Sequence, residues 1–254
     1  MSLRVVITGA SSGIGRALAA EYARHGATLG LIARREQLLQ DFAAGLKVRS
    51  ALYALDVRDA AGMARAGEDF CARFGNPDVV IASAGVSAGT STERSADRAV
   101  FQEILDVNVM GMVNTFGPFL PALRAAGAGT LVGIASVAGF RGIPGSGAYS
   151  GSKAAAIAYL ESLRVELRGS GISVVTISPG YIDTSMTRGN PYRMPFMLPA
   201  HVAATRIVRA IARRRRHVVI PWQMAIVGAI LRILPRPLYD RMFARSPRKP
   251  RRDQ

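Results

Sequence analysis

The sequence predicts an α/β fold in which helices cover both faces of one doubly wound, seven-stranded parallel sheet. Short apolar runs rich in β-branched residues alternate with longer segments of helical periodicity, which is the order of βαβ units. Most short runs are apolar at nearly every position, as expected of strands buried on both faces. No repeat and no Pro-rich or Gly/Ser-rich linker divides the 254 residues, of which 49% are hydrophobic, so one buried core is expected.

The two patterns place the elements in chain order. The apolar runs predict strands at RVVIT (4–8), TLGLIA (28–33), SALYALDV (50–57), DVVIA (78–82), GTLVGIAS (129–136), ISVVTIS (172–178) and HVVI (217–220). Helical periodicity predicts helices that include 13–25, 61–74, a long one over 107–125, 149–168 and 200–213. Residues 1–220 then form the main domain. Residues 221–254 form a helical extension packed on it, at an oligomer interface or at a membrane surface.

A glycine-rich turn, TGASSGIG at residues 8–15, follows the first strand and opens the first helix. Its glycines at positions 9, 13 and 15 allow a tight turn, and they let backbone N–H groups and the helix N-terminus approach a pyrophosphate. The spacing is GxxxGxG rather than the commoner GxGxxG, but the strand–turn–helix context supports the assignment. We therefore predict a dinucleotide-binding Rossmann fold.

The end of the second strand bears on the choice of coenzyme. An acidic residue there binds the two ribose hydroxyls of NAD(H), whereas arginine suits the 2′-phosphate of NADP(H). The sequence has Ala33, Arg34 and Arg35, with no acid before Glu36. NADP(H) is therefore preferred, and NAD(H) remains possible.

A tyrosine and a lysine at i and i+4 share one face of the predicted helix 149–168. Alone, such a pair is common on helices and indicates little. Ser136 lies thirteen residues before Tyr149, and the dinucleotide turn precedes both. Whether Tyr149 moves a proton with the help of Lys153 therefore depends on the motifs that surround the pair.

These motifs, taken in order, resemble those of the short-chain dehydrogenase/reductase family, over about residues 3–220. The shared motifs are TGASSGIG (8–15), LDV (55–57), ASAG (82–85), Asn108, Ser136, YSGSK (149–153) and PGYIDT (179–184). The resemblance implies a catalytic set of Asn108, Ser136, Tyr149 and Lys153. It implies coenzyme contacts by Gly9, Ser11, Ser12, Gly13, Ile14, Gly15, Arg34, Arg35, Asp56, Val57, Ser83, Ala84, Gly85, Asn108, Tyr149, Lys153, Pro179, Gly180, Ile182 and Thr184.

The implied chemistry suits these residue types. Hydride transfer to a carbonyl carbon leaves a developing alkoxide, which a proton donor such as Tyr149 must neutralise. The Lys153 ammonium would favour the phenolate needed for the reverse reaction and would bind the nicotinamide ribose. Ser136 would hold the carbonyl oxygen. The Asn108 side chain would bind a water that completes a proton relay through Lys153.

Two positions depart from the family pattern. Ala82 and Ser83 stand where relatives usually have two asparagines, which leaves strand stability or the contacts on the adenine side open but does not affect catalysis. Ser12 stands where NADP-dependent relatives often carry arginine or lysine, so binding of the phosphate falls to Arg34 and Arg35.

The substrate side is predicted to be apolar. Residues 185–201 form a long segment rich in Pro and Met without clear periodicity, which is typical of a lid or a disordered loop. The candidate substrate contacts are Ser136, Phe140, Ile143, Tyr149, Tyr181, Met186, Met194 and Phe196. We expect a hydrophobic ketone or alcohol, with a 3-oxoacyl, long-chain or sphingoid, or steroid-like skeleton. The alternative is a catalytically idle NADP(H)-binding sensor or scaffold that docks through its tail.

The C-terminal fifth of the chain is strongly basic and holds most of the excess positive charge of +16. Within it, Trp222, Ile226, Ile230, Ile233 and Leu234 recur at helical spacing, with arginines around them. This pattern suits a helix at the surface of an anionic membrane, through residues 222–252, or a buried contact in a homodimer or homotetramer followed by a solvated basic tail. Nucleic acid is not expected, because no reader motif accompanies the charge.

The remaining features concern location. The N-terminus runs directly into a strand pattern without a signal-peptide pattern, and the longest apolar run, 224–231, is too short to cross a membrane. The single cysteine, Cys71, excludes an internal disulfide and fits a reducing compartment. We expect a cytoplasmic protein, or one attached to the inner face of a membrane, with no metal site.

Overall fold

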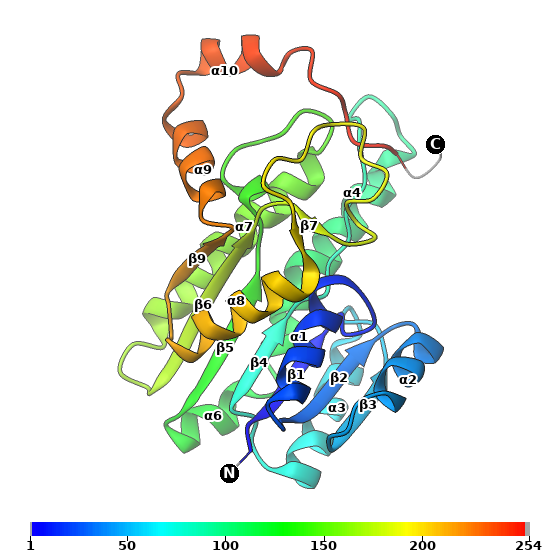
Figure 1. The fold of residues 1–254 in the computed structure, drawn as a ribbon, viewed down its shortest axis with the longest axis vertical. Coiled ribbons are helices and arrows are strands. Elements are labelled where there is room, and N and C mark those ends of the chain that lie inside the picture. The colour runs from blue at the N-terminus through cyan, green and yellow to red at the C-terminus, as the bar shows by residue number, and fades with distance from the viewer. Residues whose placement is uncertain (1, 252–254) are drawn as a thin grey trace.

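The computed structural model describes residues 2–251 (Figure 1). Residue 252, where the predicted membrane-contact segment ends, and residues 253 and 254 of the predicted extension lie outside the described range. One seven-stranded sheet crosses the molecule in the order β3-β2-β1-β4-β5-β6-β9, and every neighbouring pair is parallel. The predicted doubly wound sheet is confirmed.

The strands of the sheet follow the apolar runs closely. They are β1 (Arg4–Thr8), β2 (Thr28–Ala33), β3 (Ser50–Ala54), β4 (Val79–Ala82), β5 (Gly129–Ile134), β6 (Ile172–Pro179) and β9 (His217–Ile220). Two short strands, β7 (Ile182–Asp183) and β8 (Leu198–Pro199), form a separate pair outside the sheet. The third and fifth strands are shorter than predicted. The residues beyond them, 55–57 and 135–136, belong to loops at the carboxyl edge.

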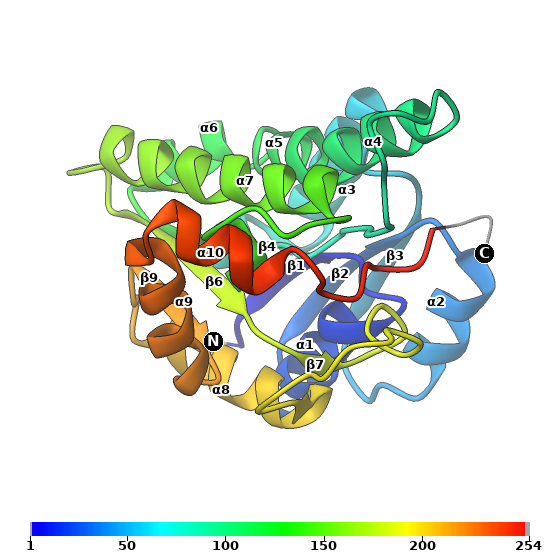
Figure 2. The same cartoon turned by 90° about the horizontal axis from the view of Figure 1, so that it is seen from above.

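Two layers of helices cover the sheet, as Figure 2 shows from above. One layer holds α1 (Gly13–Arg24), α2 (Glu36–Ala44) and α8 (Ala200–Ala212). The other holds α3 (Ala60–Phe74), α4 (Asp97–Leu105), α5 (Gly111–Phe116), α6 (Leu120–Ala126) and α7 (Gly147–Glu166). Each layer has its own apolar core, with Leu18 and Ile207 buried on one face and Phe70 and Leu160 on the other. Burial on both faces explains why the strands are apolar at successive positions.

The single helix predicted over residues 107–125 was wrong. The chain forms α4, a π-helical turn at Asp106–Met110, α5 and then α6. Gly117 and Pro118 separate α5 from α6, since proline has no N–H group to continue the hydrogen-bond ladder. The π-helical turn places Asn108 in the protein interior.

The chain beyond β9 forms α9 (Gln223–Ile233), α10 (Arg236–Phe243) and an extended tail. Arg141 fastens this extension to the main body by donating hydrogen bonds to the carbonyls of Leu231 and Leu234 at 2.5 and 2.6 Å. The Tyr239 hydroxyl donates to the Gly142 carbonyl. Seen from above, the tail passes over the carboxyl ends of the strands, between α7 and the loop after β7 (Figure 2). Among residues 2–251, no helix combines the length and the hydropathy required to span a bilayer.

Candidate active site

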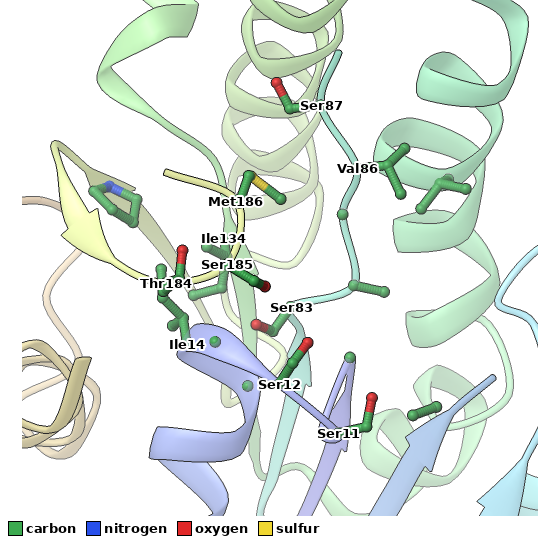
Figure 3. A pocket seen from close by; sticks show the side chains of 18 of the residues that line it. Ser11, Ser12, Ile14, Ser83, Val86, Ser87, Ile134, Thr184, Ser185 and Met186 are labelled. Atoms are coloured by element: carbon green, nitrogen blue, oxygen red, sulfur yellow. The ribbon is translucent and has the colours of Figure 1, made fainter. Parts of the chain in front are cut away.

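The main cavity has a volume of about 440 Å³ and lies at the carboxyl ends of β1, β4 and β5. This is the edge where ligands bind in doubly wound sheets. In Figure 3, Ser11, Ser12 and Ile14 from the glycine-rich turn lie on one side of the cavity. Ser83, Val86 and Ser87 follow β4, while Thr184, Ser185 and Met186 come from the segment after β7.

The glycine-rich turn leaves room for a phosphate-bearing ligand. Gly9 and Gly13 have positive φ angles of 69° and 55°, which glycine adopts without strain. A Cβ atom at Gly9 would lie 2.8 Å from the Ala84 Cα, so the turn packs tightly against the loop after β4. Ser12 precedes α1, but its side chain does not cap the helix. The N–H groups of the first turn therefore face the cavity without that internal partner, as pyrophosphate binding requires.

The two arginines after β2 have different surroundings. Arg35 donates hydrogen bonds from Nη2 to the Ser12 and Ser11 hydroxyls at 2.8 and 3.3 Å, which holds its charge beside the glycine-rich turn. Arg34 lies 3.6 Å from an Asp56 oxygen and 4.0 Å from a Glu103 oxygen. From the sequence, both arginines were predicted to bind the 2′-phosphate. In the structure, Arg35 combines its positive charge with two neighbouring hydroxyl groups, and Arg34 lies beside two carboxylates.

Asp56 also pairs with Arg58, which the sequence analysis did not select. Arg58 donates two side-chain hydrogen bonds to this carboxylate, at 3.1 and 2.8 Å. These bonds, more than the charge of Arg34, hold the pKa of Asp56 below its usual value. The carboxylate is thus ionised and already engaged at the rim of the cavity.

Tyr149 and Lys153 lie on the first turns of α7, and their side chains come together as the spacing predicted. The Lys153 Nζ lies 5.8 Å from the centre of the Tyr149 ring and donates a 2.8 Å hydrogen bond to the Ile134 carbonyl. Burial raises the pKa of Tyr149 and lowers the pKa of Lys153 to about 8. The phenol is consequently a proton donor at neutral pH, and the ammonium sits next to it in a poorly solvated place.

Ser136 follows β5 and lies beside Tyr149. Its hydroxyl hydrogen-bonds the Tyr149 hydroxyl, which partly offsets the effect of burial on the Tyr149 pKa. The same oxygen accepts a bond from the Ala138 N–H at 3.1 Å and faces the Pro179 carbonyl at 3.5 Å. These contacts fix the hydroxyl at the cavity wall, where it can bind an oxygen of a ligand.

The Asn108 side chain is buried and hydrogen-bonds two neighbouring segments of the chain. Its Nδ2 donates to the Val86 carbonyl at 3.0 Å and to the Ser152 hydroxyl at 2.9 Å, while its Oδ1 accepts from the Val86 N–H at 2.8 Å. Because both amide hydrogens are used, the side chain cannot donate to a relay water. Asn108 instead ties the loop after β4 to α7, and it does not line the cavity. Its role is to position that loop.

Thr8 holds the segment in which the two asparagines are missing. Its Oγ1 accepts hydrogen bonds from the N–H groups of Ser83 and Ala84 at 3.1 and 3.3 Å. The loop after β4 is therefore held at both ends, by Thr8 and by Asn108, and it does not need an amide side chain at position 82 or 83.

Apart from Asn108, every residue predicted to bind the coenzyme lines this one cavity. The predicted substrate contacts are divided, because Ser136, Tyr149 and Met186 line it and the others do not. Phe140 instead packs under α9, with its ring 5.9 Å from that of His217 and against Gly228. The residues outside the lining are Phe140, Ile143, Tyr181, Met194 and Phe196. The cavity is thus less apolar than the sequence predicted.

The sequence analysis missed several lining residues. They are Ala33, Leu55, Val86, Ser87, Val107, Ile134, Ala135, Ser185 and Thr187. Each lies within two residues of a selected position, so extending every motif by two residues would have included them. No group of three His, Cys, Asp or Glu side chains in residues 2–251 could hold a metal ion.

Comparison with known proteins settles the family. The family model described as short chain dehydrogenase matches residues 4–193. The chain belongs to the short-chain dehydrogenase family. An uncharacterized oxidoreductase from Myxococcus xanthus is 39% identical over 244 residues, which cover 94% of this chain and 96% of the relative.

Solved structures of short-chain dehydrogenases extend the likeness. A short chain dehydrogenase/reductase from Burkholderia phymatum in complex with NAD has a TM-score of 0.80 and 27% identity, with 98% of this chain and 97% of that chain covered. L-Sorbose reductase from Gluconobacter frateurii, complexed with NADPH and L-sorbose, has a TM-score of 0.77 and 26% identity, with 86% and 95% covered. This short-chain dehydrogenase is therefore an oxidoreductase that uses a nicotinamide coenzyme.

Proposed function

We propose that this short-chain dehydrogenase prefers NADP(H) and interconverts a ketone and a secondary alcohol, with Tyr149 as the acid and base. The observation that carries the proposal is that buried Lys153 and Ser136 and half-buried Tyr149 line the same cavity as the glycine-rich turn. When bound, the nicotinamide coenzyme supplies hydride for carbonyl reduction and accepts it in alcohol oxidation. The residues of this chain handle the proton and the oxygen.

In the reductive direction, Tyr149 donates its phenolic proton to the substrate oxygen. Burial raises the pKa of Tyr149, so the phenol is protonated at neutral pH and has a proton to donate. The Ser136 hydroxyl binds the same substrate oxygen and orients it toward Tyr149. General acid catalysis of this kind contributes a factor of roughly 10² to 10⁴ to the rate.

Lys153 stabilises the phenolate that remains after transfer. Its ammonium is held near the ring by the Ile134 carbonyl, and the low polarity of the surroundings strengthens the attraction between opposite charges. With a pKa of about 8, Lys153 can also return a proton to the phenolate near neutral pH. Asn108 ties the loop after β4, which also lines the cavity, to α7.

Support for NADP(H) comes from Arg35 with the Ser11 and Ser12 hydroxyls. Together they present one guanidinium and two hydroxyl groups next to the turn that receives the dinucleotide, a donor set suited to a phosphate. Arg34 contributes less to this preference, because it already forms ion pairs with Asp56 and Glu103.

Val86 and Met186 contribute apolar surface to the cavity that Tyr149 also lines. This favours a substrate with a modest apolar portion beside the carbonyl group. A 3-oxoacyl compound fits this description more readily than a steroid-like ring system, since the large aromatic residues expected around a ring lie outside the cavity.

A panel assay tests the proposed function. The full chain is incubated with NADPH and a series of ketones, and NADPH oxidation is compared with NADPH binding measured by fluorescence. Turnover of at least one ketone supports the proposal. Tight NADPH binding without turnover of any ketone or, in reverse, any secondary alcohol would favour the sensor or scaffold.

The apolar surface of α9 forms a separate candidate contact. Trp222, Ile226, Ile230 and Ile233 lie along one side of this helix and are each more than half exposed. Exposed arginines at positions 232 and 236 border it. Two copies of this face would bring like charges together, whereas an anionic lipid surface would neutralise them, so we favour peripheral membrane contact.

A further inference from the structure

The C-terminal tail, residues 245–251, brings a lysine to the substrate side of the cavity. The tail leaves α10 and passes over the carboxyl ends of the strands (Figure 2). The sequence favoured either a lipid-bound or a solvated basic end. In the structure, Lys249 and Arg251 turn back toward the body of the enzyme.

Two contacts fix the end of the tail. Arg251 donates two hydrogen bonds to the Asp97 carboxylate, at 2.7 and 3.1 Å, and the Asp97 side chain is almost fully buried. The Pro250 carbonyl accepts a bond from the Gly89 N–H at 2.9 Å. A paired arginine with a bidentate geometry defines both the position and the direction of the chain that precedes it.

The surface beneath the tail is shaped for close contact. A Cβ atom at Gly89 would overlap the Lys249 carbonyl, and one at Gly145 would lie 2.9 Å from the Arg248 Cβ. Only glycine at these positions allows the tail to lie this near. The path of the tail, and with it the position of Lys249, is therefore set by the protein surface.

Lys249 reaches from this path to the catalytic tyrosine. Its Nζ donates a 2.8 Å hydrogen bond to the Ser87 hydroxyl and lies 5.6 Å from the centre of the Tyr149 ring. Ser87 lines the cavity. No carboxylate of residues 2–251 lies within 4.0 Å of this ammonium. Desolvation lowers its pKa to about 8, so the group is still mostly charged at neutral pH.

A partly buried cation without an acidic partner is costly unless a ligand neutralises it. We infer that Lys249 binds a compact anionic group, a carboxylate or sulfonate, on the carbonyl substrate while Tyr149 and Ser136 bind its carbonyl oxygen. This inference rests on the proposed reductase function and narrows its substrate class to oxo acids. The coenzyme phosphates do not meet this need, because their donors lie at the glycine-rich turn.

The test compares acids with their uncharged esters. The full chain and the Lys249→Gln variant are assayed with 3-, 4- and 5-oxo acids and the methyl ester of each. For the best acid, the ratio of kcat/KM for acid over ester should fall at least tenfold in the variant, because a charge-assisted hydrogen bond is lost. Arg245→Gln, which removes an exposed cation from the same tail, should leave the ratio unchanged.

A second variant moves Lys249 without replacing it. Gly89→Val places a side chain where the Lys249 carbonyl lies, so it should lower the same ratio by displacing the tail. If Lys249→Gln changes acid and ester activity by equal factors, or changes neither, Lys249 is only a structural anchor and the inference fails.

Binding separates this inference from the proposed reaction. Calorimetric titration of the NADP⁺-loaded protein with the same oxo acids measures the anion contact without turnover. Weaker binding of the acid to Lys249→Gln, with ester binding unchanged relative to wild type, supports the anion site even if no member of the panel is reduced. Equal affinity of both proteins for every acid overturns it.

Discussion

The Lys153 ammonium and the Tyr149 ring lie 5.8 Å apart inside the protein, and the ammonium is held there by the Ile134 carbonyl rather than by an acidic side chain. A buried charge bonded only to a neutral acceptor destabilises the folded state. Its position next to a phenol explains why it is useful, since a charge developing on the phenol oxygen would be neutralised by it. Under the proposed mechanism, the Lys153 charge therefore assists catalysis while it destabilises the folded protein.

Replacing Tyr149 tests the proposed proton donor. Tyr149→Phe removes only the hydroxyl, so we expect kcat to fall by roughly 10² to 10⁴ while the dissociation constant for NADPH changes less than threefold. Steady-state kinetics and fluorescence titration measure the two quantities. Tyr159→Phe, on the same helix but outside the cavity, serves as the matched control and should retain full turnover. Undiminished activity in Tyr149→Phe would exclude the mechanism.

The cost of burying the Lys153 charge can be measured as a difference in the free energy of unfolding. The Lys153→Met variant keeps the aliphatic volume and removes the charge, so at pH 7 it should unfold with a free energy about 1–2 kcal/mol higher than wild type. The expected gain is smaller than the pKa shift alone implies, because the hydrogen bond to the Ile134 carbonyl is also lost.

The pH dependence of this gain follows from linkage. The pKa of Lys153 is about 8 in the folded protein and 10.5 when unperturbed, so the unfolded state binds the proton more tightly. Above pH 10.5 the Lys153 amine is neutral in both states and does not reduce the free energy of unfolding of the wild-type protein. That free energy decreases as the pH falls from 10.5 through 8, because the unfolded state takes up the proton first. Urea unfolding should therefore show the two proteins differing most below pH 8 and converging toward pH 10.5. A difference independent of pH would contradict the assignment.

Two single variants test the coenzyme preference. Arg35→Ala should raise KM for NADPH at least tenfold and KM for NADH less than twofold, because in the proposed binding mode only the 2′-phosphate would contact the guanidinium held by Ser11 and Ser12. Arg34→Ala is the control for loss of one nearby charge and should have a smaller effect on NADPH. If Arg35→Ala raised KM equally for both coenzymes, the assignment of Arg35 to the 2′-phosphate would be wrong.

The features predicted correctly from the sequence depend on local spacing. Gly9 and Gly13 adopt their turn because of residues next to them, and Tyr149 meets Lys153 because one helical turn separates them. Likewise, the central strands β2, β4 and β5 are recognised from unbroken apolar runs, because each of their residues is buried. These relationships are contained in short segments of chain, so pattern and motif are sufficient to find them.

The features that were missed depend on the path of distant segments. Lys249 meets Ser87 across 162 positions of sequence, and Arg251 meets Asp97 across 154. Nothing in the local pattern of a basic tail distinguishes a residue that turns inward from one that stays in solvent. The prediction that Phe140 contacts the substrate was wrong for the same reason. Phe140 packs against α9, and the position of that helix depends on tertiary packing.

The exposed side of α9 leads to a final prediction. Trp222 and Ile233 are 64% and 80% exposed, and apolar side chains arranged along one helix face bind the interface of a bilayer when nearby cations attract anionic headgroups. The full chain should float with vesicles that contain phosphatidylserine and should not float with neutral phosphatidylcholine vesicles. The double variant Ile226→Ser/Ile230→Ser should lose this binding, whereas Leu38→Ser/Val165→Ser, which removes exposed apolar residues elsewhere, should keep it. Because Lys249 and Arg251 contact the enzyme itself, we expect the exposed arginines beside α9 to provide the attraction, and Arg232→Gln/Arg236→Gln should weaken it. If instead the double isoleucine variant converts a dimer to a monomer in light scattering and vesicles bind neither protein, the face belongs to a second copy of the chain.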